Sequence, residues 1–550
     1  MTLPLQKKLS MKTISSLQRR HPERSEAESK DLRFAGCPTS RIWDLGSNHF
    51  RRHLLAPAAV LVTLALTACN PGPRYHPPAA PASAAPSYKE STFNFQDAEG
   101  WKVANPQDAM LRGKWWEIYQ EPELNALEEQ LQIDNQNIKI YFENFMEARA
   151  LIAEARAQYW PTITTSPGWS RTKSSGNLGK SSTANAGSTT SNWMFPLDVS
   201  WTPDFFGRIR NQVREAQYGA QVSAADLENE KLVEEASLAE FFFELRGQDA
   251  LQKVLDDTVV ADQKALDLTK TLYDTGVDQY ISVVEAQSAL ESAQSSALNL
   301  GVNRAQYQHA IAMLIGKPAT DVSLPVKPLL VEPPAIPTGV PAQLLQRRPD
   351  IAAAERTLAE ANATIGIGYG AFFPDVTLSA SGGFQASQFQ HWFDWPSRFW
   401  SVGPTASQTL FNGGLYRAEL NQYTATYNAD VATYRQTVLT AFQQVEDYLA
   451  ATRILSQQVI KQRQATADAE TYLKLEMGRY ETGIDPYIDV TTAQTTVLGD
   501  QQTLATLQIQ EMVASVELVQ ALGGGWDLTQ LPTPAQVSQK PPKGTYTLQR

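Results

Sequence analysis

The chain contains one 15-residue stretch twice. YDTGVDQYISVVEAQ covers Tyr273–Gln287 and YETGIDPYIDVTTAQ covers Tyr480–Gln494, so the two copies are 207 positions apart. Other landmarks repeat at a similar spacing, because Pro161 and Pro374 differ by 213 positions. The repeat covers most of each half of the 550-residue chain. It predicts two structural repeats with the same elements in the same order.

Long proline-free stretches predict unusually long helices. No proline occurs between Asp204 and Lys317, and only Pro486 interrupts the stretch from Thr405 to Leu531. Both stretches are rich in Ala, Gln, Leu and Glu, which favour helix. A single helix over residues 220–272 would be about 80 Å long, which exceeds the thickness of a membrane. Helices of this length need lateral partners, so we expect a mostly α fold of long antiparallel coiled-coil helices with a small β part.

Each repeat is also predicted to contain one β-hairpin. In WMFPLDVSW, apolar side chains at alternate positions from Trp193 to Trp201 lie on one face of a strand, with Asp198 and Ser200 on the other. We place the hairpins at about 161–202 and 374–411, which gives four strands. Four strands cannot close a barrel, and lipid does not tolerate open sheet edges. If the sheet lies in a membrane, several copies must therefore combine their strands, and three copies give a twelve-stranded β-barrel.

The charge of the chain is divided unevenly. The whole chain has a formal net charge of -11, with 47 Lys+Arg and 58 Asp+Glu. Residues 1–69 carry 11 basic and 5 acidic side chains, so the rest carries 36 and 53, a net charge of -17. Nucleic-acid binding needs clustered Lys and Arg, so we expect no nucleic-acid partner. An acidic body suits basic partners or the passage of cations.

Residues 51–69 have the pattern of a lipoprotein signal peptide. Arg51 and Arg52 precede a short apolar run, Leu54–Ala68, which is shorter than a membrane-spanning helix. The final residues, LTAC, resemble the bacterial lipobox, which implies that Cys69 is acylated and becomes the mature N-terminus. No other cofactor is expected. Because Asn70 follows, the resemblance favours the outer membrane, whereas the alternative is an ordinary signal peptide with an incidental cysteine.

The remaining segments are divided by composition. Residues 1–50 do not fit a signal peptide, and we expect them to be a non-native or misassigned N-terminal extension, with translation starting later than Met1. The Pro/Ala-rich residues 70–114 are predicted to be an extended tether. We place the first repeat at 115–335, the second at 336–526, and a flexible tail at 527–550.

Four further motifs are WWEIYQEPELNALEEQ, DFFGRIR, LLQRRPDIAAAERTLAEANATIGIGYGAFFPDVTLS and LFNGGLYRAEL. Together they resemble the outer-membrane efflux lipoproteins of the TolC family, the NodT-type and OprM-like members. The resemblance spans roughly Trp115 to Trp526. It implies a homotrimer, with a barrel in the outer membrane and an α-helical tunnel in the periplasm. It further implies a passive exit duct for small molecules that works with a periplasmic adaptor and an inner-membrane transporter of the RND type.

In that family the duplicated stretch is where two helices turn at the periplasmic end of the tunnel. Gly276 and Gly483 provide the positive φ that such a turn needs, and Asp278 and Asp485 are predicted to cap the next helices. The resemblance assigns Tyr480 and Asp489 to the periplasmic aperture, together with Asp278, Asp485 and Glu285. The salt bridge that locks the family prototype does not carry over, because Asp485 stands at the position of its arginine.

Three functional readings remain open. The residues after Cys69 contain three histidines, which are far apart, and no phosphate-binding glycine loop, so no enzyme is expected. One alternative to small-molecule efflux is a duct for secreted polypeptides, as in type I secretion. The other is a periplasmic coiled-coil scaffold lipoprotein without a pore.

Overall fold

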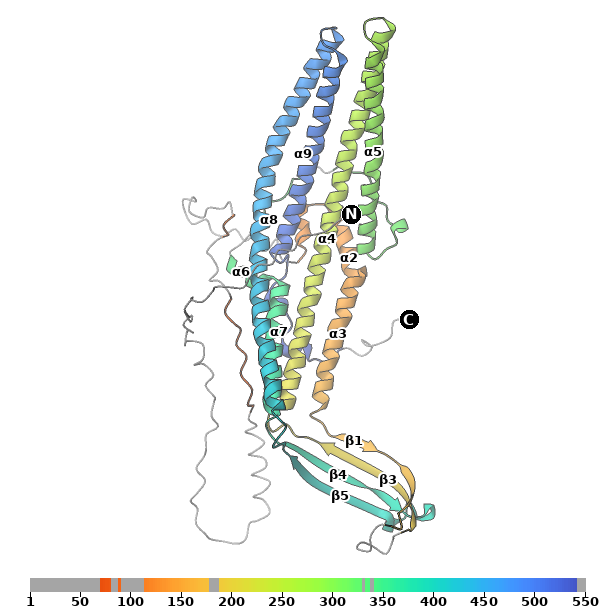
Figure 1. Ribbon diagram of the computed structural model, residues 1–550, viewed down its shortest axis with the longest axis vertical. Helices are drawn as coiled ribbons and strands as arrows, with labels where there is room; N and C mark the ends of the chain where they lie inside the picture. Colours follow the sequence, from red (N-terminus) through yellow and green to blue (C-terminus); the bar gives the residue numbers. More distant parts are fainter. Residues whose placement is uncertain are drawn as a thin grey trace, which may run out of the picture. The chain divides into compact units, whose positions relative to one another are not determined.

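Two pairs of long helices form most of the structure (Figure 1). α4 (Arg208–Asp274) and α8 (Leu415–Glu481) contain 67 residues each, which makes each helix about 100 Å long. α5 (Tyr280–Leu314) and α9 (Tyr487–Ala521) contain 35 residues each. All four boundaries repeat with a shift of 207 positions, as the duplicated stretch predicts. The computed structural model describes residues 70–80, 88–90, 113–177, 187–328, 332–336 and 341–541.

A second pair of helices repeats at the spacing of 213 positions that separates Pro161 from Pro374. α3 (Gln136–Ala157) and α7 (Pro349–Gly370) contain 22 residues each and are 213 positions apart. Both pack against α4, and α7 also packs against α8. The shorter helices of the described ranges are η2 (Trp115–Tyr119), α2 (Pro122–Asp134), η3 (Ala319–Asp321), α6 (Pro341–Arg347), η4 (Phe389–His391), η5 (Trp395–Ser397), η6 (Leu528–Gln530) and α10 (Pro534–Val537).

The two hairpins join into one antiparallel sheet. The strand order is β1-β3-β4-β5, and β2 also pairs with β3, so the described residues contain five strands where four were predicted. The first predicted strand is divided because Pro167 stands between β1 and β2 and has no N–H for the ladder. The bounds are β1 (Thr162–Thr165), β2 (Gly168–Lys173), β3 (Thr189–Trp201), β4 (Asp375–Ala386) and β5 (Arg398–Ser407).

The sheet has one apolar and one polar face. Val199 pairs with Ala380, which pairs with Val402, and residues that pair directly lie on the same face. On the opposite face Asp198 pairs with Ser381. This is the alternation that the sequence predicts for β3. No helix in the described ranges is long and apolar enough to cross a membrane.

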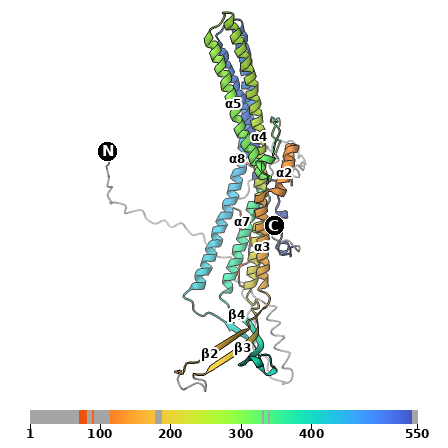
Figure 2. The same ribbon diagram turned by 90° about the vertical axis from the view of Figure 1, so that its right-hand side faces the viewer.

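Two of the apolar cores stabilise the helices at different levels. Near the middle, Trp115, Trp116 and Phe243 are buried where η2 and α2 meet α4. At the far end from the sheet, Leu266, Val283 and the ends of α8 and α9 form a smaller core. This second core joins the α4–α5 pair to the α8–α9 pair. Figure 2 shows the same helices from the side.

The segment beyond the second repeat, predicted to be a flexible tail, contacts the helices over its described part. Val537 is buried against α3 and α4, together with Ile152 and Ala220. Arg149 and Arg156 donate hydrogen bonds to backbone carbonyls of the tail, at 3.3 Å to Val537 and 3.1 Å to Ser538. The apolar contact and the two guanidinium groups hold residues 532–541, which their proline content had suggested would fray.

The tether also packs against helices. Tyr75 donates a 2.5 Å hydrogen bond to Glu355 on α7, and Glu90 forms a 2.6 Å ion pair with Arg453 on α8. Tyr88 is buried beside α8. The expected extension (1–50), the signal peptide with Cys69 (51–69), tether residues 81–87 and 91–112, and tail residues 542–550 lie outside the described residues.

Candidate functional site

The two helix turns at the ends farthest from the sheet have the same backbone geometry. Gly276 has φ +74° and Gly483 has φ +70°, a region that favours glycine. Each glycine N–H donates to the carbonyl three residues earlier, Tyr273 in the first turn and Tyr480 in the second, at 2.9 Å in both. The residue after each glycine donates to the carbonyl five residues before it, so both helices end in Schellman motifs. We call residues 273–280 the first tip and residues 480–487 the second tip.

A hydrogen bond joins the two tips. The Tyr480 hydroxyl donates to Oδ2 of Asp278 at 2.6 Å, across 202 positions of sequence. Burial and the bond to Asp278 raise the pKa of Tyr480. Burial alone would also raise the pKa of Asp278, but hydrogen bonds from Tyr480, the backbone of Gln279 and Ser282 outweigh it and lower that pKa. Asp278 is therefore ionised at neutral pH, and the link is a charge-assisted hydrogen bond.

Asp485 has a different partner from the one predicted. It does not cap α9, because Pro486 is the N-cap residue and no side chain caps that end. Arg479 binds both oxygens of Asp485, with Nη2 at 3.0 Å from Oδ1, and this hydrogen bonding lowers the pKa of Asp485. Asp278 likewise precedes the N-cap residue of α5, which is Gln279. The predicted cap is wrong for Asp485, which bonds Arg479, whereas Asp278 accepts the N–H of Gln279 at 2.7 Å from one residue before the N-cap position.

The other predicted aperture residues lie nearby but are not joined to Tyr480. Asp489 is half-buried on α9, on the same side as Arg479, whose pKa it helps to raise after Asp485 and Glu476. Glu285 is half-buried on α5. Burial, with smaller contributions from Asp262 and Glu285, raises the pKa of Tyr487 to about 12. The structure therefore brings Tyr480 together with Asp278, and Asp489 together with the Arg479–Asp485 pair.

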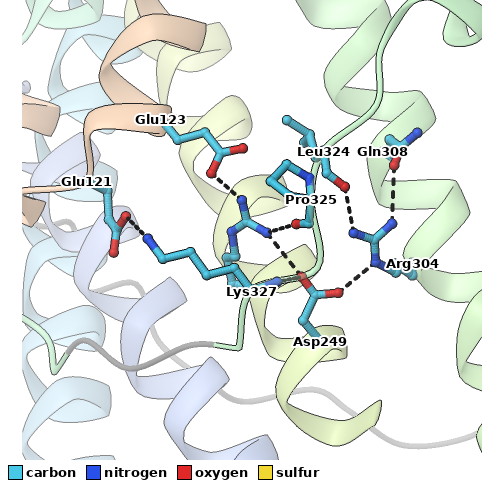
Figure 3. Close-up of polar contacts among 9 residues, drawn as sticks. Glu121, Glu123, Asp249, Arg304, Gln308, Leu324, Pro325 and Lys327 are labelled. Atoms are coloured by element: carbon cyan, nitrogen blue, oxygen red, sulfur yellow. Dashed lines mark hydrogen bonds and ion pairs between the residues drawn. The ribbon is translucent and has the colours of Figure 1, made fainter. Parts of the chain in front are cut away.

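A buried ion cluster holds the first helix pair to the chain that follows it (Figure 3). The Asp249 carboxylate on α4 binds Arg304 on α5 at 2.6 Å and Arg246 at 3.1 Å. It also accepts the backbone N–H of Lys327 at 2.9 Å. Arg246 in turn binds Glu123 at the start of α2 at 2.5 Å. One buried carboxylate thus fixes α4, α5, α2 and the segment after η3 to one another.

A second polar cluster lies beside the middle core. Glu235 on α4 accepts hydrogen bonds from Trp115 at 3.0 Å and Gln132 at 3.1 Å. Burial raises its pKa to about 7, against these two hydrogen bonds, which act to lower it. Both carboxylate oxygens of Glu128 lie buried without a hydrogen-bond partner in the described part of the chain. Burial and then Glu235 raise the pKa of Glu128 well above its usual value.

Several of these residues were missed by sequence reasoning. Arg479 stands one residue before the second tip, and its charge alone could have drawn attention to it. Arg246 and Asp249 are three positions apart on one helix face, a spacing that favours an ion pair. Arg304, the second partner of Asp249, lies on another helix, so no sequence pattern predicts this ion pair. Among the described residues no group of three or more His, Cys, Asp or Glu could hold a metal ion.

Comparisons with known proteins agree with this architecture. The family model described as "Outer membrane efflux protein" matches residues 125–317 and 340–524. The probable efflux pump outer membrane protein TtgC of Pseudomonas putida is 29% identical over 503 residues, covering 88% of this chain and 99% of that protein. Outer membrane protein OprJ of Pseudomonas aeruginosa is 29% identical over 487 residues, covering 87% and 97%.

Solved structures share the fold. The outer-membrane channel OprN has a TM-score of 0.74 and 26% identity, covering 83% of this chain and 100% of that one. The CmeC channel of Campylobacter jejuni has the same TM-score at 19% identity, covering 84% and 96%, which supports the fold alone. With two matched segments, duplicated helix pairs and a sheet with one apolar face, the chain belongs to the outer membrane efflux protein family.

Proposed function

We propose that three copies of this chain form a passive exit duct for small molecules across the outer membrane, with a gate at the tips. The hydrogen bond from Tyr480 to Asp278 carries this proposal, because it ties the free ends of the two helix pairs together. Relatives are named for the efflux of antibiotics, toluene and solvents, which favours small organic substrates. Energy would come from an inner-membrane transporter of the RND type, joined through a periplasmic adaptor.

The sheet supports assembly from several copies. Its apolar face suits lipid, and its Ser- and Thr-rich face suits water. β5 has no neighbour on its outer edge in the described chain, and an open edge in lipid costs several kcal/mol for each unpaired group. Counting β1 and β2 as one interrupted strand, three copies would close a barrel of about twelve strands.

The start of the described chain supports a lipid on Cys69. The side-chain amide of Asn70, the next residue, exchanges hydrogen bonds with Asn211 at 3.0 and 3.3 Å. Asn211 lies one turn into α4, beside the bend at Gly207 where β3 gives way to the helix. A lipid on the residue before Asn70 would therefore start at the boundary between sheet and helices, within reach of the bilayer. Cys69→Ser should abolish metabolic labelling with palmitate, and unchanged labelling would contradict the assignment.

Single-channel recording in planar bilayers tests the duct. We expect the purified protein to conduct, and Asp489→Ala to change cation selectivity or block by multivalent cations, because removing one carboxylate per protomer weakens the attraction for cations. Unchanged selectivity would remove Asp489 from the aperture. A bilayer that stays closed under every stimulus would favour the scaffold. Genetic linkage to an RND transporter and an adaptor, or to an ABC exporter with a protein substrate, separates efflux from polypeptide secretion.

A further inference from the structure

The two tips share one internal geometry but differ in exposure. Tyr273 and Tyr280 in the first tip have ring centroids 5.5 Å apart at 55°. Tyr480 and Tyr487 in the second tip have ring centroids 5.2 Å apart at 57°. The first pair is 44% and 62% exposed, whereas the second pair is 4% and 2% exposed. The same tyrosine pair is therefore covered in one repeat and uncovered in the other.

The cover on the second pair is a definite surface of α4. Ala265 and Leu266 are buried in the same cluster as Tyr480. Thr269 is buried beside the Tyr480 hydroxyl, which donates to Asp278. Small and apolar side chains leave room for the ring, and two oxygen atoms surround its hydroxyl. We call this surface the α4 seat.

The duplication places a copy of this seat on α8. Adding 207 positions to Ala265, Leu266, Thr269 and Asp278 gives a surface that we call the α8 seat, Tyr472, Leu473, Glu476 and Asp485. Tyr472 is 46% exposed, whereas Leu473 packs in part on the core of its own protomer and Glu476 and Asp485 are half-buried. The chain thus has an exposed tyrosine pair and a partly exposed copy of the surface that covers such a pair.

These two surfaces cannot meet within one protomer. α4 packs against α9, so α5 and α8 stand at the outer sides of the four helices (Figure 1). A tyrosine pair on one outer side and a seat on the other are complementary surfaces of a head-to-tail contact, which closes into a ring when the rotation allows it. The occupant that fits the α8 seat is therefore a second copy of this chain.

We propose that Tyr273 and Tyr280 of one protomer bind in the α8 seat of the next protomer, in the way that Tyr480 and Tyr487 bind in the α4 seat. This contact rests on the proposed function, in which three copies form a duct, and it would be the part of the gate that lies between neighbouring protomers. The Tyr273 hydroxyl would face Glu476 and the Arg479–Asp485 pair of the next copy.

The joint between protomers would be weaker than the joint within each protomer. Glu476 replaces the buried Thr269, and Tyr472 replaces the small Ala265. Arg479 replaces Leu272 and occupies the carboxylate of Asp485, whereas Asp278 is free to accept from Tyr480. Exposed charges are screened by salt, and a buried apolar contact is not. Both joints would therefore hold the gate closed, and the joint between protomers would be the one that salt weakens.

Crosslinking at matched positions tests the contact. The double variant Tyr273→Cys/Glu476→Cys is treated with a short bismaleimide in isolated outer membranes. We expect covalent dimers and trimers on denaturing gels. The control Tyr480→Cys/Thr269→Cys, which the duplication relates to the same two positions, should link within one chain and form no larger species. In 1 M salt the yield between protomers should fall about twofold or more, while the yield within protomers stays constant.

Two outcomes would overturn the proposal. One is that the control Tyr480→Cys/Thr269→Cys crosslinks within its chain while Tyr273→Cys/Glu476→Cys gives no covalent dimers, although native mass spectrometry still shows the oligomer. A loss of the oligomer itself would instead count against the proposed function. A second variant needs no cysteine: Glu476→Thr gives α8 the residue of the α4 seat and should lower the open fraction severalfold in bilayers. An open fraction that is unchanged or higher would also refute the contact.

Discussion

Tyr480→Phe removes one hydroxyl from the link between the tips and keeps the ring. The lost bond is a 2.6 Å hydrogen bond to an ionised carboxylate, a class worth about 1.5–3 kcal/mol. We expect the low end, about 1.5 kcal/mol, because Asp278 keeps the Gln279 N–H at 2.7 Å and the Ser282 hydroxyl at 3.0 Å. The ring remains packed on Tyr487. Each protomer should therefore separate its tips about tenfold more often.

Single-channel recording measures this change as a rise in the open fraction at unchanged conductance per opening. Tyr416→Phe is the control, because it removes the same atom near the start of α8, where the hydroxyl bonds Thr409 at 3.2 Å. Asp278→Asn, which removes the charge and keeps the shape, should act in the same direction as Tyr480→Phe. If both tip variants show the open fraction of the wild type and of the control, the link does not hold the tips together.

The link should also tolerate mild acid. The pKa of Asp278 is lowered from its usual value of 3.8, so its contribution is complete above that value and is lost only as pH falls through the lower folded-state pKa. The open fraction of the wild type should therefore not rise between pH 8 and pH 5 through this group. A rise in that range that Tyr480→Phe abolishes would show that the sign assigned to Asp278 is wrong.

Three further changes test the helices and their buried charges. Asp249→Ala leaves Arg246 and Arg304 without their shared carboxylate. Thermal unfolding should show that the free energy of unfolding falls by about 3–5 kcal/mol. A fall of less than about 1 kcal/mol would mean that the cluster does not stabilise the fold. Glu235→Gln should flatten the pH dependence of stability. In the wild type a pKa of about 7 makes the free energy of unfolding fall by about 3 kcal/mol between pH 4.5 and 7. An equal slope in the variant would contradict this. Gly483→Ala, at φ +70°, should destabilise the second tip by about 1 kcal/mol, seen as faster amide exchange in residues 480–487, and an unchanged exchange rate would refute the need for glycine.

Sequence reasoning predicted the helices well because their determinants are local. The proline-free stretches and the duplicated glycine turns place α4, α5, α8 and α9, and the family comparison agrees with the fold that the motifs implied. The predicted number of strands was wrong because the effect of Pro167, which divides the first strand into β1 and β2, was not considered. For the tail, composition could not show that Val537 contacts α3 and α4.

The candidate site divides in the same way. The positive φ of Gly276 and Gly483 follows from the turn sequence itself. The partners of the tip carboxylates do not, because Asp278 bonds a tyrosine 202 positions away and Asp485 bonds Arg479 where helix caps had been expected. A helix cap depends on neighbours in sequence, whereas the bond from Tyr480 to Asp278 depends on how two hairpins lie beside each other. The bond from Arg479 to Asp485 lies within the second hairpin and depends on the shape of its turn.

The sequence by itself determined that this protein is built twice, with helices longer than a membrane is thick and a glycine turn at the end of each pair. Only the tertiary structure decided that one of the two identical tyrosine pairs is buried and the other exposed. The physical reason is that helix length and turn geometry are encoded within a few residues of where they occur. Burial of a side chain depends on the surface that packs against it. When the two hairpins of one protomer pack together, the tyrosine pair of the second tip lies in their contact, and the tyrosine pair of the first tip lies outside it.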